Sequence, residues 1–139
     1  MGLSSLICSR NHGTIAATLR EILPKLGLER KNLFITSKLG PKDQGASKCQ
    51  AAIDLALEEL ETDYLDLFLI HWPGVQGADV TSANNAVLRQ ESWKTMEENF
   101  KSGKLRAIGV SNYTLEHLHQ LLEACEVVTH VLQVEVHPK

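Results

Sequence analysis

Each of four apolar, strand-like segments in this sequence ends on polar side chains that could do chemistry. They include an amine, an imidazole, a hydroxyl and carboxamides, which hold substrates by hydrogen bonds or transfer protons in active sites. Because parallel strands bring their carboxyl ends to one rim of a sheet, we expect these side chains to converge there. In chain order they are Lys38, His71, Ser111 with Asn112, and Gln133 on the same face as Glu135.

Taken singly, each of these residues is a weak signal. A lysine at a strand end is most often solvated, and one histidine after a strand can simply bind a backbone carbonyl. Four strands that share the feature favour a functional site. Rival sites lack their motifs, since the sequence has no Gly-x-Gly-x-x-Gly or Gly-x4-Gly-Lys loop and no Gly-x-Ser-x-Gly elbow. His117 and His119 point in different directions on a helix, and we predict no metal site.

The segment LDLFLIHWP, residues 65–73, indicates how one of these groups is positioned. A short continuous apolar run is typical of a strand that is covered on both faces. Pro73 ends strand pairing because it has no N–H to donate. We therefore expect His71 at the point where a buried strand meets solvent.

Helical and strand patterns alternate along the chain. Apolar spacing predicts helices over 15–26, 49–60, 93–100 and 115–125, and strands over 33–37, 65–70, 105–110 and 131–136. Pro24 should end or kink the first helix near its last turn, and a polar loop over 74–87 should precede the third helix. Ser47 with Gln50 forms a capping-box pattern, and Thr114 can cap the last helix.

This alternation implies an α/β fold with a parallel sheet and right-handed crossovers. Four strands could form an open doubly wound sheet, a small flavodoxin-like domain or half of a (β/α)8 barrel. The polar strand ends favour the barrel, whose active sites lie on that rim. Gly109 inside a strand indicates close backbone approach, and Trp93, Met96 and Phe100 are expected in a helix core.

Composition narrows the class of protein further. The chain has 139 residues, enough for one domain, and a net charge of −3 from 14 basic and 17 acidic residues, which disfavours a nucleic-acid partner. No apolar run is long enough to span a membrane, and the first residues do not resemble a secretory signal. Three scattered cysteines indicate reduced thiols, so we expect a cytoplasmic protein.

Four ordered motifs resemble those of one known family. The segments LFITSKL, YLDLFLIHWPG, GKLRAIGVSNY and VLQVEVHP are similar to successive strand-end motifs of the aldo-keto reductases, and the resemblance covers residues 11–139. It implies a partial (β/α)8 TIM barrel with about four of eight strands, as one domain over 1–139 whose residues 1–10 diverge. It also implies reduction of aldehydes and ketones to alcohols with NADPH.

The resemblance assigns roles to the residues at the strand ends. Lys38 would lower the pKa of a catalytic tyrosine, and His71 would orient the substrate carbonyl by a hydrogen bond. Trp72 would wall the substrate pocket. The nicotinamide carboxamide would be held by Ser111, Asn112 and Gln133.

The sequence departs from the family pattern at its start. Alignment on Asn11 puts Ser9 at the position of the catalytic tyrosine and Ser4 at that of the aspartate. Later family elements, including those that grip the adenosine phosphate, have no counterpart, so we expect a truncated family member. The alternative is a non-catalytic relative that acts by protein association, including self-association through open sheet edges.

Overall fold

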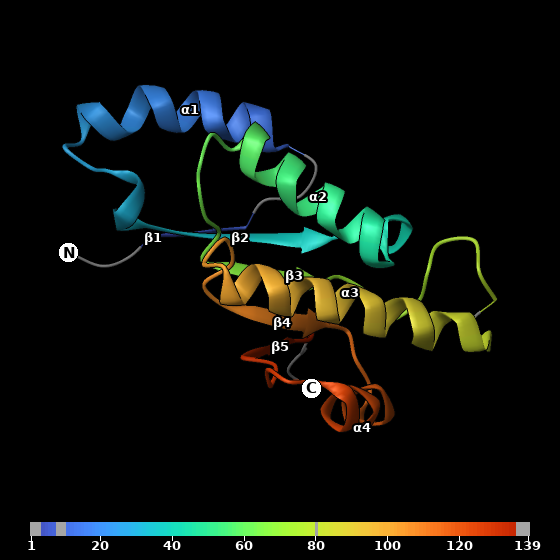
Figure 1. Cartoon of the computed structure of the whole chain (residues 1–139). Coiled ribbons are helices and arrows are strands. Elements are labelled where there is room, and N and C mark those ends of the chain that lie inside the picture. The colour runs from blue at the N-terminus through green and yellow to red at the C-terminus, as the bar shows by residue number, and fades with distance from the viewer. Residues whose placement is uncertain (1–3, 8–10, 80, 136–139) are drawn as a thin grey trace, which may run out of the picture.

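A five-stranded parallel sheet forms the centre of the molecule (Figure 1). The structure is a computed structural model and describes residues 4–7, 11–79 and 81–135. The strands follow one another in chain order from one edge of the sheet to the other. The elements are β1 (Ser4–Ile7), α1 (His12–Lys25), η1 (Arg30–Asn32), β2 (Leu33–Leu39), η2 (Pro41–Asp43), α2 (Ala46–Glu59), β3 (Leu67–Ile70), α3 (Ala83–Lys101), β4 (Ile108–Ser111), α4 (Leu115–Ala124) and β5 (Val131–Gln133).

The predicted α/β fold with parallel strands is confirmed, and one strand was missed. Residues 1–10 were not expected to form a strand, yet Ser4–Ile7 pair in parallel with Leu33–Thr36 of β2. Four residues are too few to give a clear alternation pattern. What selects the strand is the open backbone edge of β2, whose N–H and C=O groups need partners.

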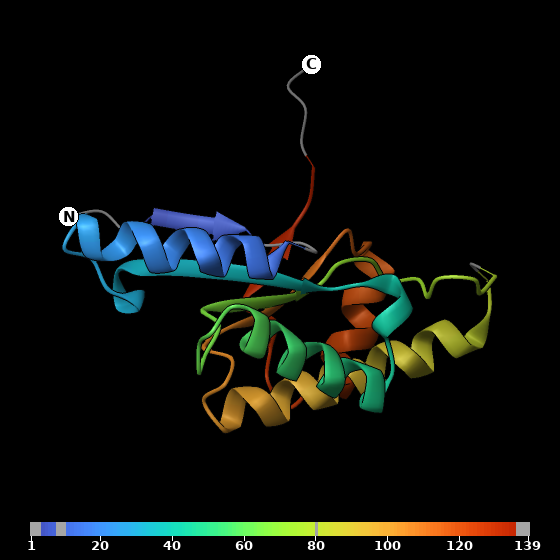
Figure 2. The same cartoon turned by 90° about the horizontal axis from the view of Figure 1, so that it is seen from above.

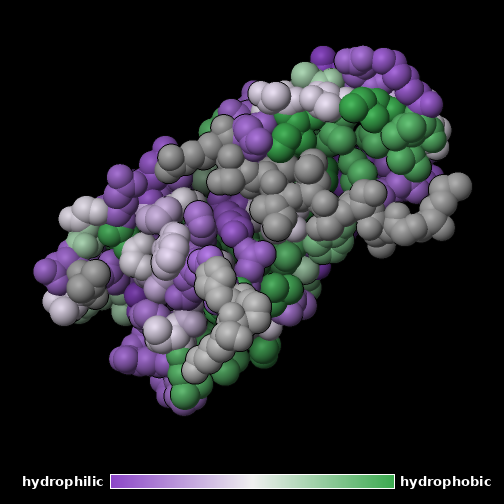
Figure 3. All heavy atoms as spheres, turned by 180° about the vertical axis from the view of Figure 1, so that it is seen from behind, coloured by the Kyte–Doolittle hydropathy of each residue, from purple (hydrophilic) through white to green (hydrophobic). Residues whose placement is uncertain are grey.

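The helices α2 and α3 cover one face of this sheet. α2 and α3 pack against each other, with α2 against β2 and α3 against β4. Figure 2 shows α2 and α3 on one side of the strands. Figure 3 shows the side away from the view of Figure 1, where hydrophobic side chains gather at the upper right and hydrophilic ones toward the lower left.

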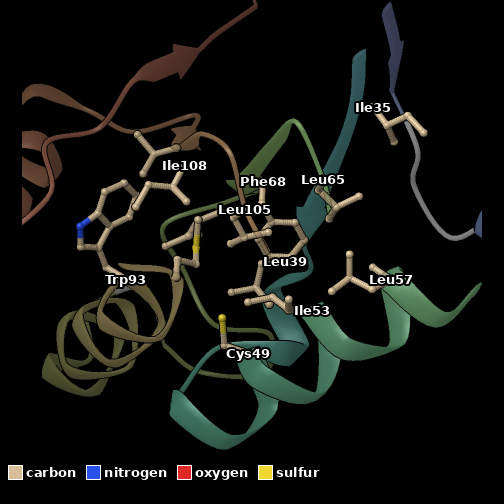
Figure 4. Close-up of a cluster of buried hydrophobic side chains, with 14 of the residues drawn as sticks. Ile35, Leu39, Cys49, Ile53, Leu57, Leu65, Phe68, Trp93, Leu105 and Ile108 are labelled. Atoms are coloured by element: carbon tan, nitrogen blue, oxygen red, sulfur yellow. The ribbon is translucent and has the colours of Figure 1, made fainter. Parts of the chain in front are cut away.

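The hydrophobic core lies between the sheet and the helices (Figure 4). α2 contributes Cys49 and Ile53, both fully buried, from the helical face that was expected to be apolar. α3 contributes Trp93 and Met96, which are buried as predicted. All four residues of β3 are buried, which agrees with its continuous apolar run.

The starts of α2 and α3 differ from the prediction, and in both helices a hydrogen bond between residues far apart in the sequence accounts for the difference. α2 begins after Gly45, whose φ of 102° suits glycine, so Ser47 lies inside the helix and is not its cap. The Gly45 N–H donates instead to Ser92 Oγ at 2.8 Å. α3 begins within the predicted loop, where Ser82 caps it and Asn85 Oδ1 accepts a hydrogen bond from the Val75 N–H at 3.0 Å.

The predicted bounds of the other strands are only partly confirmed, since β3 begins at Leu67 instead of residue 65 and β4 spans Ile108–Ser111 instead of 105–110. Thr114 caps α4, and the helix that contains Pro24 ends at Lys25. β5 is shorter than predicted, since Val134 and Glu135 lie outside it and residue 136 lies outside the described residues. A Cβ on Gly109 would lie 2.5 Å from the Val131 carbonyl oxygen, which explains the glycine.

None of the described helices combines the length and the apolar character that crossing a membrane requires.

Candidate active site at the carboxyl rim

Three of the predicted side chains share one face of the sheet at its carboxyl rim. The register pairs Ser111 with Gln133, and His71 follows the pair Ile70 and Val110. Side chains alternate between the two faces along a strand, so His71, Ser111 and Gln133 lie on the same face of neighbouring strands. The expected convergence is confirmed for these backbone positions, while their roles stay predictions.

Lys38 lies on that face too, slightly farther from the rim. It pairs with Leu69, two residues before His71, and is therefore one pleat, about 6.6 Å along the strand, below it. It was expected to end its strand, but β2 continues to Leu39. No hydrogen bond or ion pair joins the Lys38 amine to a described residue, and partial burial lowers the pKa of this amine.

A cavity of about 1090 Å³ gathers three of the six predicted site residues. Lys38, His71 and Trp72 line it, together with residues of η2 and one face of α2. The cavity lining does not include Ser111 at the end of β4, Asn112 directly after β4, or Gln133 at the end of β5, which lie beside the cavity. The rim thus has two parts, a cavity at β2 and β3 and an amide-rich edge at β4 and β5.

Backbone contacts hold His71 at the junction of these two parts. Its N–H donates to the Leu39 carbonyl at 3.1 Å, which extends strand pairing one residue beyond β3. Its own carbonyl accepts a hydrogen bond from Asn112 Nδ2 at 3.0 Å. The imidazole lies beside the indole of Trp72, with ring centroids 5.9 Å apart, and this indole is half exposed.

Asn112 has a left-handed backbone conformation. Its φ is 60°, a conformation that asparagine adopts more readily than most residues, and it directly follows β4. Its N–H donates to the Gln133 carbonyl at 2.9 Å, and its Nδ2 also donates to Ser111 Oγ at 3.2 Å. Asn112 therefore ties together β3, β4 and β5. Gln133 is half-buried, and its side chain has no hydrogen bond to a described residue.

The sequence did not indicate a chain of hydrogen bonds at the other end of the cavity. His12 Nε2 lies 2.9 Å from Ser37 Oγ, and His12 Nδ1 lies 3.1 Å from Glu59 Oε2. The order of groups resembles a nucleophile with its base, but Ser37 is 1% exposed within a paired strand and has no adjacent turn that offers free N–H donors. We interpret the chain as a link between α1, β2 and α2. Only the fold brings these three residues together.

Neither tyrosine of the sequence lies in the cavity. Tyr113 is packed into the hydrophobic core, its hydroxyl has no hydrogen-bond partner among the described residues, and burial raises its pKa. Tyr64 lies before β3, at the opposite end of the strands, between the guanidinium groups of Arg30 and Arg106. Ser9, predicted at the tyrosine position, is outside the described residues, and so is the side chain of Ser4.

The fold agrees with the result of comparison to known proteins. The family model of the aldo/keto reductases matches residues 11–139. The chain therefore belongs to the aldo/keto reductase family, as its strand-end motifs indicated.

Individual relatives support the assignment over part of their length. A glyoxal reductase of Bacillus subtilis is 44% identical over 113 residues, covering 81% of this chain and 37% of that protein. The aldose reductase structure from Schistosoma japonicum has a TM-score of 0.83 at 34% identity, covering 96% of this chain and 48% of that one. The chain thus spans less than half the length of these relatives.

A solved structure with bound cofactor has the same arrangement. An aldo-keto reductase complexed with NADPH has a TM-score of 0.83 at 29% identity, and the match covers 96% of this chain and 41% of that one.

Proposed function

We propose that this chain supplies the carbonyl-binding and nicotinamide-binding part of a site that reduces aldehydes and ketones to alcohols with NADPH. His71 orients the carbonyl oxygen, Lys38 lines the same cavity, and Trp72 offers an apolar wall to the rest of the substrate. Ser111, Asn112 and Gln133 hold the nicotinamide carboxamide. The reduced thiols of Cys49 and Cys125 fit the cytoplasmic location that we also propose.

One observation carries this proposal. The hydrogen bond from Asn112 Nδ2 to the His71 carbonyl, 3.0 Å long, joins the amide-rich edge to the cavity. A carbonyl in the cavity and a carboxamide on the edge would therefore be held next to each other, as transfer between two bound molecules requires.

The residues of the amide-rich edge fit a carboxamide. Such a group donates from its nitrogen and accepts at its oxygen, and it needs partners of both kinds. The Gln133 side chain has both a donor and an acceptor, and neither is used by a described residue. Bound NADPH would supply the hydride, and the protein residues would hold and orient the reactants.

The alcohol oxygen also needs a proton. A positioned general acid contributes about 10²–10⁴-fold to the rate. Since neither Tyr64 nor Tyr113 lines the cavity, the His71 imidazole is the group of the proposed site suited to this task. Because no tyrosine lines the cavity to assist His71, we expect this chain by itself to give no measurable turnover. We also expect it to bind the nicotinamide weakly.

Cofactor binding tests the proposal. NADPH is added to the isotope-labelled chain, and backbone amide signals are followed by NMR. We expect shifts at Ser111, Asn112 and Gln133, with affinity weaker than micromolar. Gln133→Ala should weaken binding about two- to tenfold, the value of a lost hydrogen bond.

The matched control is Gln90→Ala on the exposed surface of α3, which should leave binding unchanged. Shifts confined to other parts of the chain, or equal binding by both variants, would contradict the assignment of the edge. Aldehyde-dependent oxidation of NADPH that disappears in His71→Ala would contradict the expected lack of turnover.

A further inference from the structure

The cavity at the ends of β2 and β3 contains a lysine in an unusual setting. Lys38 is half-buried, whereas Lys42 and Lys48, which line the same cavity, are exposed. No carboxylate of the described residues pairs with Lys38, although Asp43 and Glu59 also line the cavity. The residues outside the described ranges include no aspartate or glutamate side chain.

These conditions favour the neutral form of the amine. An ammonium ion loses the stabilisation of its hydration shell on burial, and a nearby carboxylate normally compensates for this loss. Lys38 loses hydration on burial without gaining a carboxylate partner among the described residues, and burial lowers its pKa. A neutral amine has a free electron pair and is a nucleophile, as in enzymes whose desolvated lysines attack carbonyl compounds.

We propose that the Lys38 amine condenses reversibly with small aldehydes in this cavity to form an imine. This activity rests on the carbonyl site of the proposed function, and it needs no nicotinamide. It would make the cavity a covalent aldehyde-binding site.

The step balances without an oxidant or a reductant. The nitrogen electron pair attacks the carbonyl carbon, and the oxygen takes up a proton to give a carbinolamine. The C–O bond then breaks, the nitrogen loses its second hydrogen, and a C=N bond forms. The carbonyl oxygen leaves as water with both hydrogens of the amine.

Neighbouring residues in the cavity suit this chemistry. His71 lies one pleat above Lys38 on the adjacent strand, and an imidazole can protonate the leaving hydroxyl near neutral pH. Trp72 contributes an apolar wall for the carbon chain of the aldehyde. Lys42 and Lys48, being exposed, keep the hydration that stabilises their charged form.

Reductive trapping tests the proposal. The chain is incubated near neutral pH with a limiting amount of propionaldehyde and sodium cyanoborohydride, without NADPH. The hydride reduces an imine to a stable secondary amine, and mass spectrometry of peptides identifies the labelled lysines. We expect most of the label on Lys38, little on Lys42 and Lys48, and its loss in Lys38→Arg.

Two further variants separate reactivity from structure. Lys104→Arg, which alters an exposed lysine paired with Asp54, should leave the labelling of Lys38 unchanged. His71→Gln should slow labelling at Lys38 and leave that of Lys104 as it was. The peptide map of the unaltered chain is decisive even if Lys38→Arg does not fold.

Label spread evenly over Lys38, Lys42 and Lys48, or its absence from Lys38, would overturn the proposal. Because NADPH is left out, that result would not affect the amide-rich edge, which cofactor titration tests separately.

Discussion

Asp66 shows how a single residue can organise the end of the sheet opposite the site. Its Oδ2 accepts hydrogen bonds from Arg30 Nη2 at 2.8 Å and from the buried Ile35 N–H at 2.9 Å. Arg106 approaches its other oxygen at 3.6 Å. The carboxylate therefore joins β2 to the start of β3, and it compensates for its own burial through these partners.

Replacing Asp66 should destabilise the fold without affecting the rim. Asp66→Ala removes the side-chain acceptor of the buried Ile35 N–H and the carboxylate paired with Arg30, and we expect the free energy of unfolding to fall by about 2–4 kcal/mol. Urea denaturation measures the change. Asp54→Ala, which breaks the exposed pair with Lys104, is the control and should cost under about 1 kcal/mol. Equal losses in both variants would show that burial of Asp66 is unimportant.

At the scale of elements, the distance between β4 and β5 depends on Gly109. A Cβ there would lie 2.5 Å from the Val131 carbonyl oxygen and 2.7 Å from Leu69 Cδ2. Val131 belongs to the same short strand as Gln133. A larger residue would therefore push away the strand that carries one of the proposed nicotinamide contacts.

Gly109→Ala should cost about 1–3 kcal/mol of stability, the usual range for overpacking, and should weaken the NADPH-induced shift at Gln133. Gly13→Ala makes the same chemical change in α1, where nothing lies within 4 Å of the new Cβ. It should stabilise the chain by up to about 1 kcal/mol, because alanine favours a helix. Thermal melts of both variants provide the test, and a neutral Gly109→Ala would refute the close-approach argument.

In the molecule as a whole, the described strands form an open sheet with two edge strands, β1 and β5. β5 pairs only with β4 among the described strands, and Leu132 and Val134 at this edge are 41% and 48% exposed. Unpaired strand edges with apolar side chains are templates for pairing with another chain. This exposure is the observation that favours the alternative function, protein association.

The chain by itself should therefore bind a hydrophobic dye and self-associate as its concentration rises. Leu132→Lys places a charge at the β5 edge and should shift sedimentation toward the monomer. Leu115→Lys changes a more exposed leucine, 69% accessible, at the start of α4, and should have little effect. A sharp, cooperative melt of a dye-free monomer would argue instead for a self-sufficient domain.

Features that depend on local patterns could be predicted from the amino-acid sequence. Four of the five strands, the four helices and the cap at Thr114 follow from apolar spacing and from residues that are close in the chain. The rim position of His71, Ser111 and Gln133 also follows, because alternating helices and strands force a parallel sheet whose strand ends coincide. The side-chain roles were available only through the resemblance to the family.

Features that depend on contacts between residues far apart in the sequence could not be predicted and became visible in the fold. β1 exists because β2 offers it an edge, and α2 starts at Gly45, whose N–H has a partner in Ser92 on α3. The hydrogen bonds of His12 with Ser37 and Glu59 leave no trace in local sequence. The same holds for Lys38, whose sequence position predicts a strand end but not its burial without a carboxylate. Hydration and pairing depend on everything that surrounds a charge, and only the fold brings those surroundings together.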